Sequence, residues 1–316
     1  MKLRLERSKI FRTNMKEYLI GVGAVGSFYG GIMAKSGADI TLVGRGKSFN
    51  MIKENGLILN RAKEIQLIHP KIIEHISEIV KPKVVILAVK SYDLKEVSRE
   101  LANVVKPETT IITLQNGLDN DKKVLEYLNC EVLPGLVLVS ATKTSSNEVT
   151  QKGSQQKLVF GPRDGKKTRK MSEILEIFKD SGIDAVLSEN IALELWKKFF
   201  FVVAFSSATV AGRCSIGEAL NNPKLLRLYS QVLREAIAVG EKEGVIFEPD
   251  IFETTLEEAL NFDPSTKSSL LVDLEKGRPT EVEVLQGAVI RLAKKHGLAV
   301  PATLGVYQEI LTSFIL

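Results

Sequence analysis

The stretch Gly21-Val22-Gly23-Ala24-Val25-Gly26 decides the fold of this chain. It follows a short apolar run, Tyr18-Leu19-Ile20, and opens an amphipathic segment over 27–36 that ends at Gly37. A G-x-G-x-x-G turn between a strand and a helix is typical of dinucleotide sites, because its glycines permit a tight turn, a close approach to the pyrophosphate and close helix packing. The helix N-terminus then offers free N–H groups to the phosphates. This context favours a nucleotide site over a plain glycine-rich turn; its predicted cofactor-binding residues are Gly21, Gly23, Ala24, Val25 and Gly26.

The end of the second predicted strand, Asp39-Ile40-Thr41-Leu42-Val43, indicates which dinucleotide is bound. An NAD-selective site has an Asp or Glu near this strand end that binds the ribose hydroxyls. Here the strand runs into Gly44-Arg45-Gly46-Lys47 instead. The guanidinium of Arg45 can bind a 2′-phosphate through two hydrogen bonds, and Lys47 adds a second positive charge. We therefore expect NADP(H) rather than NAD(H), with a solvated basic loop as the alternative interpretation.

The composition is that of an ordinary soluble globular protein, with 316 residues, 44% of them hydrophobic and 26% charged. This length is sufficient for two domains with cores of their own. No apolar run is long enough to cross a bilayer, so we expect no membrane association. The two cysteines, Cys130 and Cys214, form no C-x-x-C, which argues against a disulfide framework or a thiolate metal site. We expect a cytoplasmic protein without a metal.

The net charge of +5 comes mainly from residues 1–14, which hold five basic side chains and one acidic one. Without this segment the charges nearly balance, so the composition does not suggest nucleic acid as a partner. Because the first predicted strand begins only after Met15, residues 1–14 are expected to be a basic extension, or Met15 is the true start. The segment lacks the apolar core of a secretory signal.

Strands and helices alternate through the first half of the chain and give way to helices in the second half. Besides the first two, the predicted strands lie at 84–88, 110–114, 132–139, 158–160 and 184–187. The predicted helices lie at 167–181, 190–209, 223–243, 264–276, 280–296 and 303–314. We expect an α/β fold with a mainly parallel, doubly wound Rossmann sheet over 15–188, followed by an all-α domain over 189–316. Ligands are expected at the carboxyl ends of the strands, where the second domain closes over them.

Hydride transfer to a carbonyl requires a proton donor for the developing alkoxide. None of the three histidines is an attractive donor, and no metal-ligand cluster offers a Lewis acid. Burial can lower the pKa of a lysine toward neutrality, and the helix that starts Trp196-Lys197-Lys198 is nearly all apolar after its lysines. The pattern alone gives equal weight to the alternative that both lysines extend into solvent.

Together these motifs resemble the ketopantoate reductase (2-dehydropantoate 2-reductase) family over nearly everything after Met15. The matching motifs, in family order, are the glycine turn with Arg45, then Ala88-Val89-Lys90, Gln115-Asn116-Gly117, LWKKF at 195–199, SSLLVD at 268–273, PTEVE at 279–283 and HGLAVP at 296–301. The resemblance implies NADPH-dependent reduction of 2-dehydropantoate to (R)-pantoate in pantothenate and coenzyme A biosynthesis. It also implies a C-terminal domain like that of 6-phosphogluconate dehydrogenase, and it makes a homodimer plausible.

The resemblance further implies a role for each matching residue. Lys198 corresponds to the catalytic lysine that protonates the substrate's C2 oxygen, and Glu281 to a carboxylate that binds the substrate's hydroxyl, organises the lysine and contacts the cofactor. Asn116 and Lys90 correspond to residues beside both cofactor and substrate, and Ser269 to a hydroxyl that contacts the substrate carboxylate. Without the resemblance, Glu281 is more readily explained as a first-turn helix acid and Asn116 as a turn residue.

The lysine helix departs from the enterobacterial form of this family, which has asparagines one and two turns after the lysine. Here Val202 and Ser206 occupy those positions. Valine cannot hydrogen-bond a substrate, whereas Ser206 remains a substrate-binding candidate with a shorter side chain. A reductase of a different 2-oxo or 3-hydroxy acid is therefore the main alternative. An NADPH-binding protein without activity is a second one, which the retention of Lys198 and Glu281 disfavours.

Overall fold

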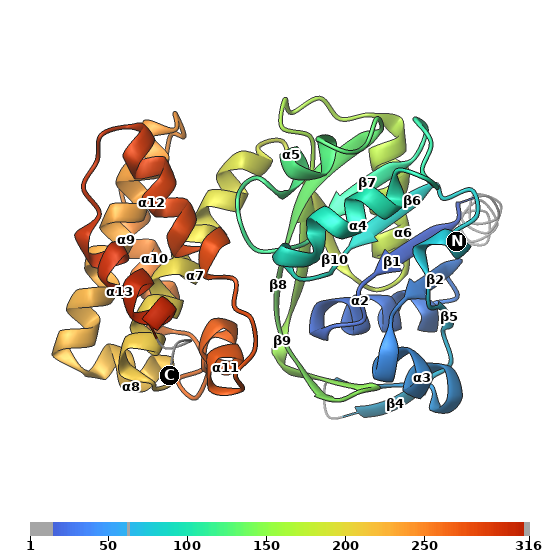
Figure 1. Cartoon of the computed structure of the whole chain (residues 1–316), viewed down its shortest axis with the longest axis horizontal. Helices are drawn as coiled ribbons and strands as arrows, with labels where there is room; N and C mark the ends of the chain where they lie inside the picture. Colours follow the sequence, from blue (N-terminus) through green and yellow to red (C-terminus); the bar gives the residue numbers. More distant parts are fainter. Residues whose placement is uncertain (1–14, 62–63, 313–316) are drawn as a thin grey trace, which may run out of the picture. The chain divides into compact units, whose positions relative to one another are not determined.

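The structure is a computed structural model that describes residues 15–61 and 64–312. The chain divides into two compact units (Figure 1). Unit 1 comprises the chain up to Gln115 together with Asp119–Ile191, and unit 2 comprises Asn116–Leu118 and Ala192–Leu316. The extension expected over residues 1–14 lies outside the described residues. In the described part of the chain, no helix is both long and apolar enough to cross a membrane.

A ten-stranded sheet forms unit 1, in the order β4-β3-β9-β8-β7-β6-β1-β2-β5, with β10 paired to β9 (Figure 1). The strands are β1 (Glu17–Ile20), β2 (Ile40–Val43), β3 (Leu57–Arg61), β4 (Glu64–Ile68), β5 (Lys71–Ile73), β6 (Val84–Leu87), β7 (Thr110–Thr113), β8 (Glu131–Ser145), β9 (Glu148–Phe160) and β10 (Asp184–Leu187). Six neighbouring strands, in the order β5-β2-β1-β6-β7-β8, pair in parallel, as expected for a doubly wound sheet. The pairs β8–β9 and β3–β4 are antiparallel, so the whole sheet is mixed.

Helices cover both faces of this sheet because successive strand residues point to opposite sides. In β1, Leu19 belongs to a core with α2 (Ala24–Lys35) and α6 (Arg169–Asp180). Its neighbours Tyr18 and Ile20 belong to a second core with α4 (Leu94–Leu101) and α5 (Asn120–Leu125). Both faces of the central strands are therefore buried, which explains their nearly continuous apolar sequences.

Unit 2 is helical and is built around α7 (Ile191–Gly212). The other elements are α8 (Ile216–Asn221), α9 (Pro223–Lys242), α10 (Ile251–Leu260), α11 (Ser269–Glu275), the short η3 (Val282–Val284), α12 (Gln286–Lys295) and α13 (Pro301–Thr312). Most of α7 is buried in a core shared with α9, α12 and α13, as a helix that is apolar on nearly all sides requires. The start of α9 is fixed by Asn222, whose side chain accepts hydrogen bonds from Lys224 and Leu225.

Several predicted boundaries are wrong for identifiable reasons. The helix expected from 264 begins only at Ser269, because Ser268 caps it by accepting a hydrogen bond from the Leu271 amide. The helix expected over 280–296 is interrupted at Leu285, whose φ of −105° and ψ of −97° separate η3 from α12. Strands β8 and β9 extend far beyond 132–139 and 158–160, because backbone pairing continues where the apolar pattern stops.

Candidate active site

The glycine turn between β1 and α2 is built for close packing at two positions and open space at a third. Gly21 has a φ of +102°, and a Cβ there would lie 2.7 Å from the Val89 amide nitrogen. A Cβ on Gly26 would lie 1.8 Å from the Gly21 carbonyl oxygen. Beside Gly23, in contrast, no heavy atom of the described chain other than those of Gly23 and its two chain neighbours lies within 4 Å of a Cβ position. Since α2 has no acid in its first turn and no side-chain cap, this space fits a pyrophosphate.

Two alanine substitutions are expected to separate packing from ligand binding in this turn. Gly26→Ala forces a methyl group into the backbone of Gly21 and is expected to lower the free energy of unfolding by about 1–3 kcal/mol or more. Gly23→Ala has room for its methyl group, so the melting temperature should be close to wild type while NADPH affinity falls. Thermal unfolding and a fluorescence titration measure the two effects. Equal loss of stability in both variants would contradict this division.

The basic residues expected at the end of β2 lie in unit 1 and are accessible. Arg45 precedes α3 (Gly46–Asn55), and its side chain is 72% exposed. Its only described ion pair is a 3.4 Å contact with Asp93, and an exposed pair of this kind is weak. Lys47 is exposed in the first turn of α3. Lys90, partly buried, directly precedes η2 (Ser91–Asp93).

The two adjacent lysines in the second turn of α7 differ in their surroundings within unit 2. The Nζ of Lys197 forms a surface ion pair with Glu248 Oε1 at 2.9 Å. Lys198 is partly buried and lies between the buried residues Trp196 and Phe199, which belong to the core of unit 2. Burial lowers the pKa of Lys198 to about 8, while the carboxylate of Glu281 acts in the opposite direction. Lys198 is thus the lysine with the properties of a proton donor near neutral pH.

Glu281 and Asn116 lie with Lys198 in unit 2. The side chain of Glu281 is buried, with 8% of the residue exposed, and it directly precedes η3. It is therefore not a first-turn acid of a long helix, which was the alternative explanation for it. The Asn116 Nδ2 donates to Glu281 Oε2 at 3.4 Å. A lysine with a lowered pKa, a buried carboxylate and an amide thus come from three distant parts of the chain.

The remaining predicted substrate contacts differ in accessibility. Ser269, the first residue of α11, is exposed. Ser206 is 1% exposed, and its hydroxyl donates to the Val203 carbonyl at 3.2 Å and accepts from Gln286 Nε2 at 2.9 Å. The role of Ser206 as a substrate ligand stays a prediction. Gln286 was not predicted as a site residue, although a glutamine on the apolar side of a predicted helix signals a buried hydrogen-bond partner.

Lys143 was not predicted as a site residue either, because it lies beyond the predicted end of β8. Its Nζ donates to the Val22 carbonyl within the glycine turn at 2.5 Å and to Ser48 Oγ in α3 at 2.7 Å. Local sequence could not indicate that Lys143 contacts both the glycine turn and α3, since more than a hundred residues separate it from the turn.

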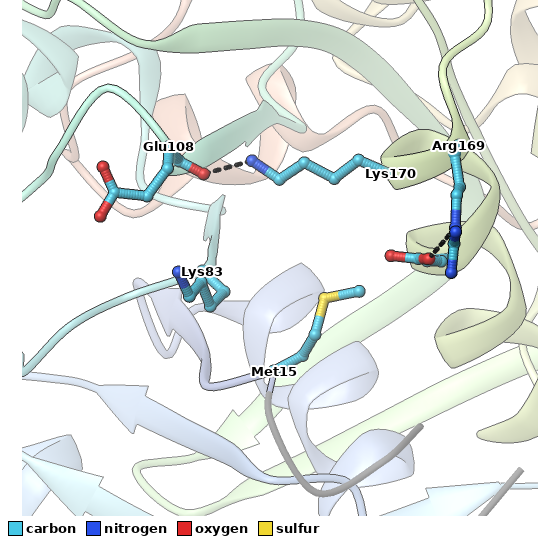
Figure 2. A pocket seen from close by; sticks show the side chains of 6 residues that line it. Met15, Lys83, Glu108, Arg169 and Lys170 are labelled. Atoms are coloured by element: carbon cyan, nitrogen blue, oxygen red, sulfur yellow. Dashed lines mark hydrogen bonds and ion pairs between the residues drawn. The ribbon is translucent and has the colours of Figure 1, made fainter. Parts of the chain in front are cut away.

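A surface hollow of unit 1 lies at the amino ends of the parallel strands, whereas the glycine turn lies at their carboxyl ends. Figure 2 shows Met15, Lys83, Glu108 and Lys170 around it. The first three precede β1, β6 and β7 respectively, so the hollow is at the amino ends of parallel strands. Lys170 donates to the Glu108 carbonyl, and Arg169 pairs with Glu173 at 2.8 Å (Figure 2). Nucleotides bind at the carboxyl ends of such strands, so this hollow is not the cofactor site.

Metal-ligating side chains and histidines form no second candidate centre in the part of the chain that the structure describes. Within residues 15–61 and 64–312, no three His, Cys, Asp or Glu side chains gather as metal ligands. Of the histidines, His296 ends α12, and its Nε2 lies 2.5 Å from Glu243 Oε1. His75 caps η1 (Ile76–Glu78).

Comparison with known proteins identifies two matching family models. The model for Ketopantoate reductase PanE/ApbA matches residues 18–165, and its C-terminal model matches residues 190–312. A 2-dehydropantoate 2-reductase from Pyrococcus horikoshii is 28% identical, with 91% of this chain and 93% of the relative covered. A PanE/ApbA family ketopantoate reductase structure from Ralstonia eutropha has a TM-score of 0.87 at 24% identity, covering 94% of this chain and 98% of the other. A D-mandelate dehydrogenase structure with NADH and anilino(oxo)acetate has a TM-score of 0.85 at 21% identity, covering 94% and 98%.

Proposed function

Because the chain belongs to the ketopantoate reductase family, an oxidoreductase family, we propose that it reduces 2-dehydropantoate to (R)-pantoate with NADPH. The observation that carries the proposal is the group formed by Lys198, Glu281 and Asn116, which supplies a proton donor, a carboxylate and an amide in one place. The glycine turn supports the dinucleotide part of the proposal, since it offers open space and free N–H groups at a helix N-terminus. Cytoplasmic pantothenate biosynthesis and a homodimer stay predictions.

The chain's own residues account for the proton in this reaction. When bound, the reduced nicotinamide supplies the hydride that reaches the C2 carbonyl carbon. The Lys198 ammonium donates a proton to the C2 oxygen, which becomes the product hydroxyl. A pKa of about 8 keeps this amine mainly protonated at neutral pH and makes it a better acid than an ordinary lysine. The Glu281 carboxylate, held by Asn116, accepts a hydrogen bond from the substrate's hydroxyl.

The preference for NADPH is supported by the charges at the end of β2. Arg45 and Lys47 are exposed there, and no acid follows the strand to bind ribose hydroxyls. The D-mandelate dehydrogenase neighbour, in contrast, has NADH bound in its structure. We favour NADPH because the charged residues belong to this chain, whereas the neighbour at 21% identity shares the fold alone.

A second candidate, the reduction of a different 2-oxo acid, is favoured by Val202. This residue is partly exposed one turn after Lys198, where an apolar side chain suits an apolar substrate group. An aromatic 2-oxo acid, of the kind related to the substrate for which the D-mandelate dehydrogenase neighbour is named, is one such compound, and a 3-hydroxy acid is another alternative.

A kinetic assay tests these assignments together. We expect fast, saturable oxidation of NADPH with 2-dehydropantoate, followed as loss of reduced-nicotinamide absorbance. Benzoylformate, the oxidised counterpart of mandelate, and NADH serve as the competing substrate and cofactor. A higher kcat/KM with benzoylformate than with 2-dehydropantoate would mean that the proposed substrate is wrong. A higher kcat/KM with NADH than with NADPH would mean that the proposed cofactor is wrong. Tight NADPH binding without turnover of any 2-oxo acid would contradict the enzymatic proposal.

A further inference from the structure

Lys143 joins two elements that lie beside the proposed cofactor site of unit 1. It is near the end of β8, in register with Val149 of β9. From there its Nζ donates to the carbonyl of Val22, inside the glycine turn, and to the hydroxyl of Ser48, in the first turns of α3. One ammonium group therefore connects the loop before α2 with the segment that follows Arg45.

This ammonium has no negative partner in the described chain. No carboxylate of the described residues forms an ion pair with Lys143, and its hydrogen bonds go to two neutral oxygen atoms. Lys143 is partly buried, and burial alone lowers its pKa to about 8. A partly buried cation without a counter-charge is unfavourable in the free protein, and such groups gather at sites that bind a charged ligand.

The surrounding backbone adds further positive potential. Neither α2 nor α3 has an acid in its first turn or a side chain that caps it, so the positive ends of two helices lie next to Lys143. Two acids do contact the end of β2: Asp93 lies 3.4 Å from Arg45, and Glu74 Oε1 accepts from the Gly46 amide at 3.4 Å. Both contacts are long and exposed, so they leave the region short of negative charge.

We propose that Lys143 and Ser48 bind the 2′-phosphate of NADP(H) together with Arg45. Two of the three ammonium hydrogens of Lys143 are used, which leaves one for a phosphate oxygen. Ser48 accepts from Lys143, so its own O–H is free to donate to the same phosphate. The adenosine end of a dinucleotide lies beyond the second strand of a Rossmann fold, which is where these residues are. This inference rests on the proposed use of NADPH.

Cofactor affinity measured without substrate tests the assignment. Dissociation constants for NADPH and NADH are compared by fluorescence titration for wild type, Lys143→Met and Lys143→Arg, with Arg45→Ala as a positive control. Removing one charge-assisted hydrogen bond to the phosphate is expected to raise the Kd for NADPH by about 10-fold or more and to leave the Kd for NADH within about 2-fold. Lys143→Arg should retain most of the preference. Lys152→Met, at an exposed lysine of β9, is the matched control and should change neither constant.

The outcomes distinguish this inference from the proposed function. If Lys143→Met weakens both cofactors equally, the lysine only supports the glycine turn, and the inference is overturned. A wild type that binds NADPH no more tightly than NADH contradicts the proposed cofactor as well. If Lys143→Met does not fold, the NADPH and NADH affinities of Ser48→Ala test the inference instead, because this substitution removes only a hydroxyl. That variant should show a smaller loss restricted to NADPH, and an unchanged NADPH affinity would overturn the inference.

Discussion

Replacement of Lys198 by alanine is expected to lower kcat for the reduction of 2-dehydropantoate by roughly 100-fold to 10,000-fold, the usual contribution of a general acid. Without the ammonium, the developing alkoxide must take its proton from water in a site where burial has already lowered the lysine pKa to about 8. The effect should appear in kcat more than in the Kd for NADPH, since the proton is transferred in the chemical step. Steady-state kinetics and a cofactor titration measure both quantities.

Lys197→Ala is the matched control for this experiment. Lys197 is the preceding residue on α7 and has the same charge, but its Nζ pairs with Glu248 at the surface, 2.9 Å away. An exposed pair of this kind contributes about 0–1 kcal/mol to stability, so kcat should stay near wild type. A large loss in Lys197→Ala, or full kcat in Lys198→Ala with an intact fold by circular dichroism, would refute the assignment of the proton donor.

The difference between these two lysines shows where sequence reasoning reaches its limit. The apolar run after Trp196 indicates a buried helix, but two adjacent lysines at its start are equivalent in the pattern. Their roles separate only through partners far along the chain, Glu248 for Lys197 and Glu281 for Lys198. The resemblance to a family, rather than helical periodicity, singled out Lys198.

The glycine turn was predictable because its information is local. Its tight backbone and its open side at Gly23 follow from residue types within one strand–turn–helix unit, whereas the residue that packs against Gly21, Val89, lies just beyond the end of β6. The extensions of β8 and β9 were not predictable, since their polar residues are held by pairing between the two strands rather than by an apolar face. Lys143, which lies on one of these extensions, was missed for the same reason.

Activity is expected to decrease as the pH rises through about 8, because the protonated form of Lys198 is the proton donor. Glu281 opposes the effect of burial by stabilising this protonated form. In Glu281→Gln the negative charge is gone, so the Lys198 pKa falls further and the alkaline decrease in kcat/KM moves to a lower pH. A neutral amide accepts a weaker hydrogen bond from the substrate's hydroxyl than a carboxylate does, so kcat/KM should also fall by roughly 10-fold.

A matched variant separates this local effect from a general change in charge. Glu283 lies two residues away on η3, where it accepts from Tyr307 Oη at 2.5 Å and pairs with Arg291 at 3.3 Å, and its side chain is 60% exposed. Glu283→Gln removes the same charge at an exposed position, so the pH profile of kcat/KM should keep its wild-type midpoint. Because glutamine can still accept a hydrogen bond from Asn116, a shift in Glu281→Gln reports the lost charge rather than a lost contact. A midpoint that stays in place or rises in Glu281→Gln would mean that this carboxylate does not control the protonation of Lys198.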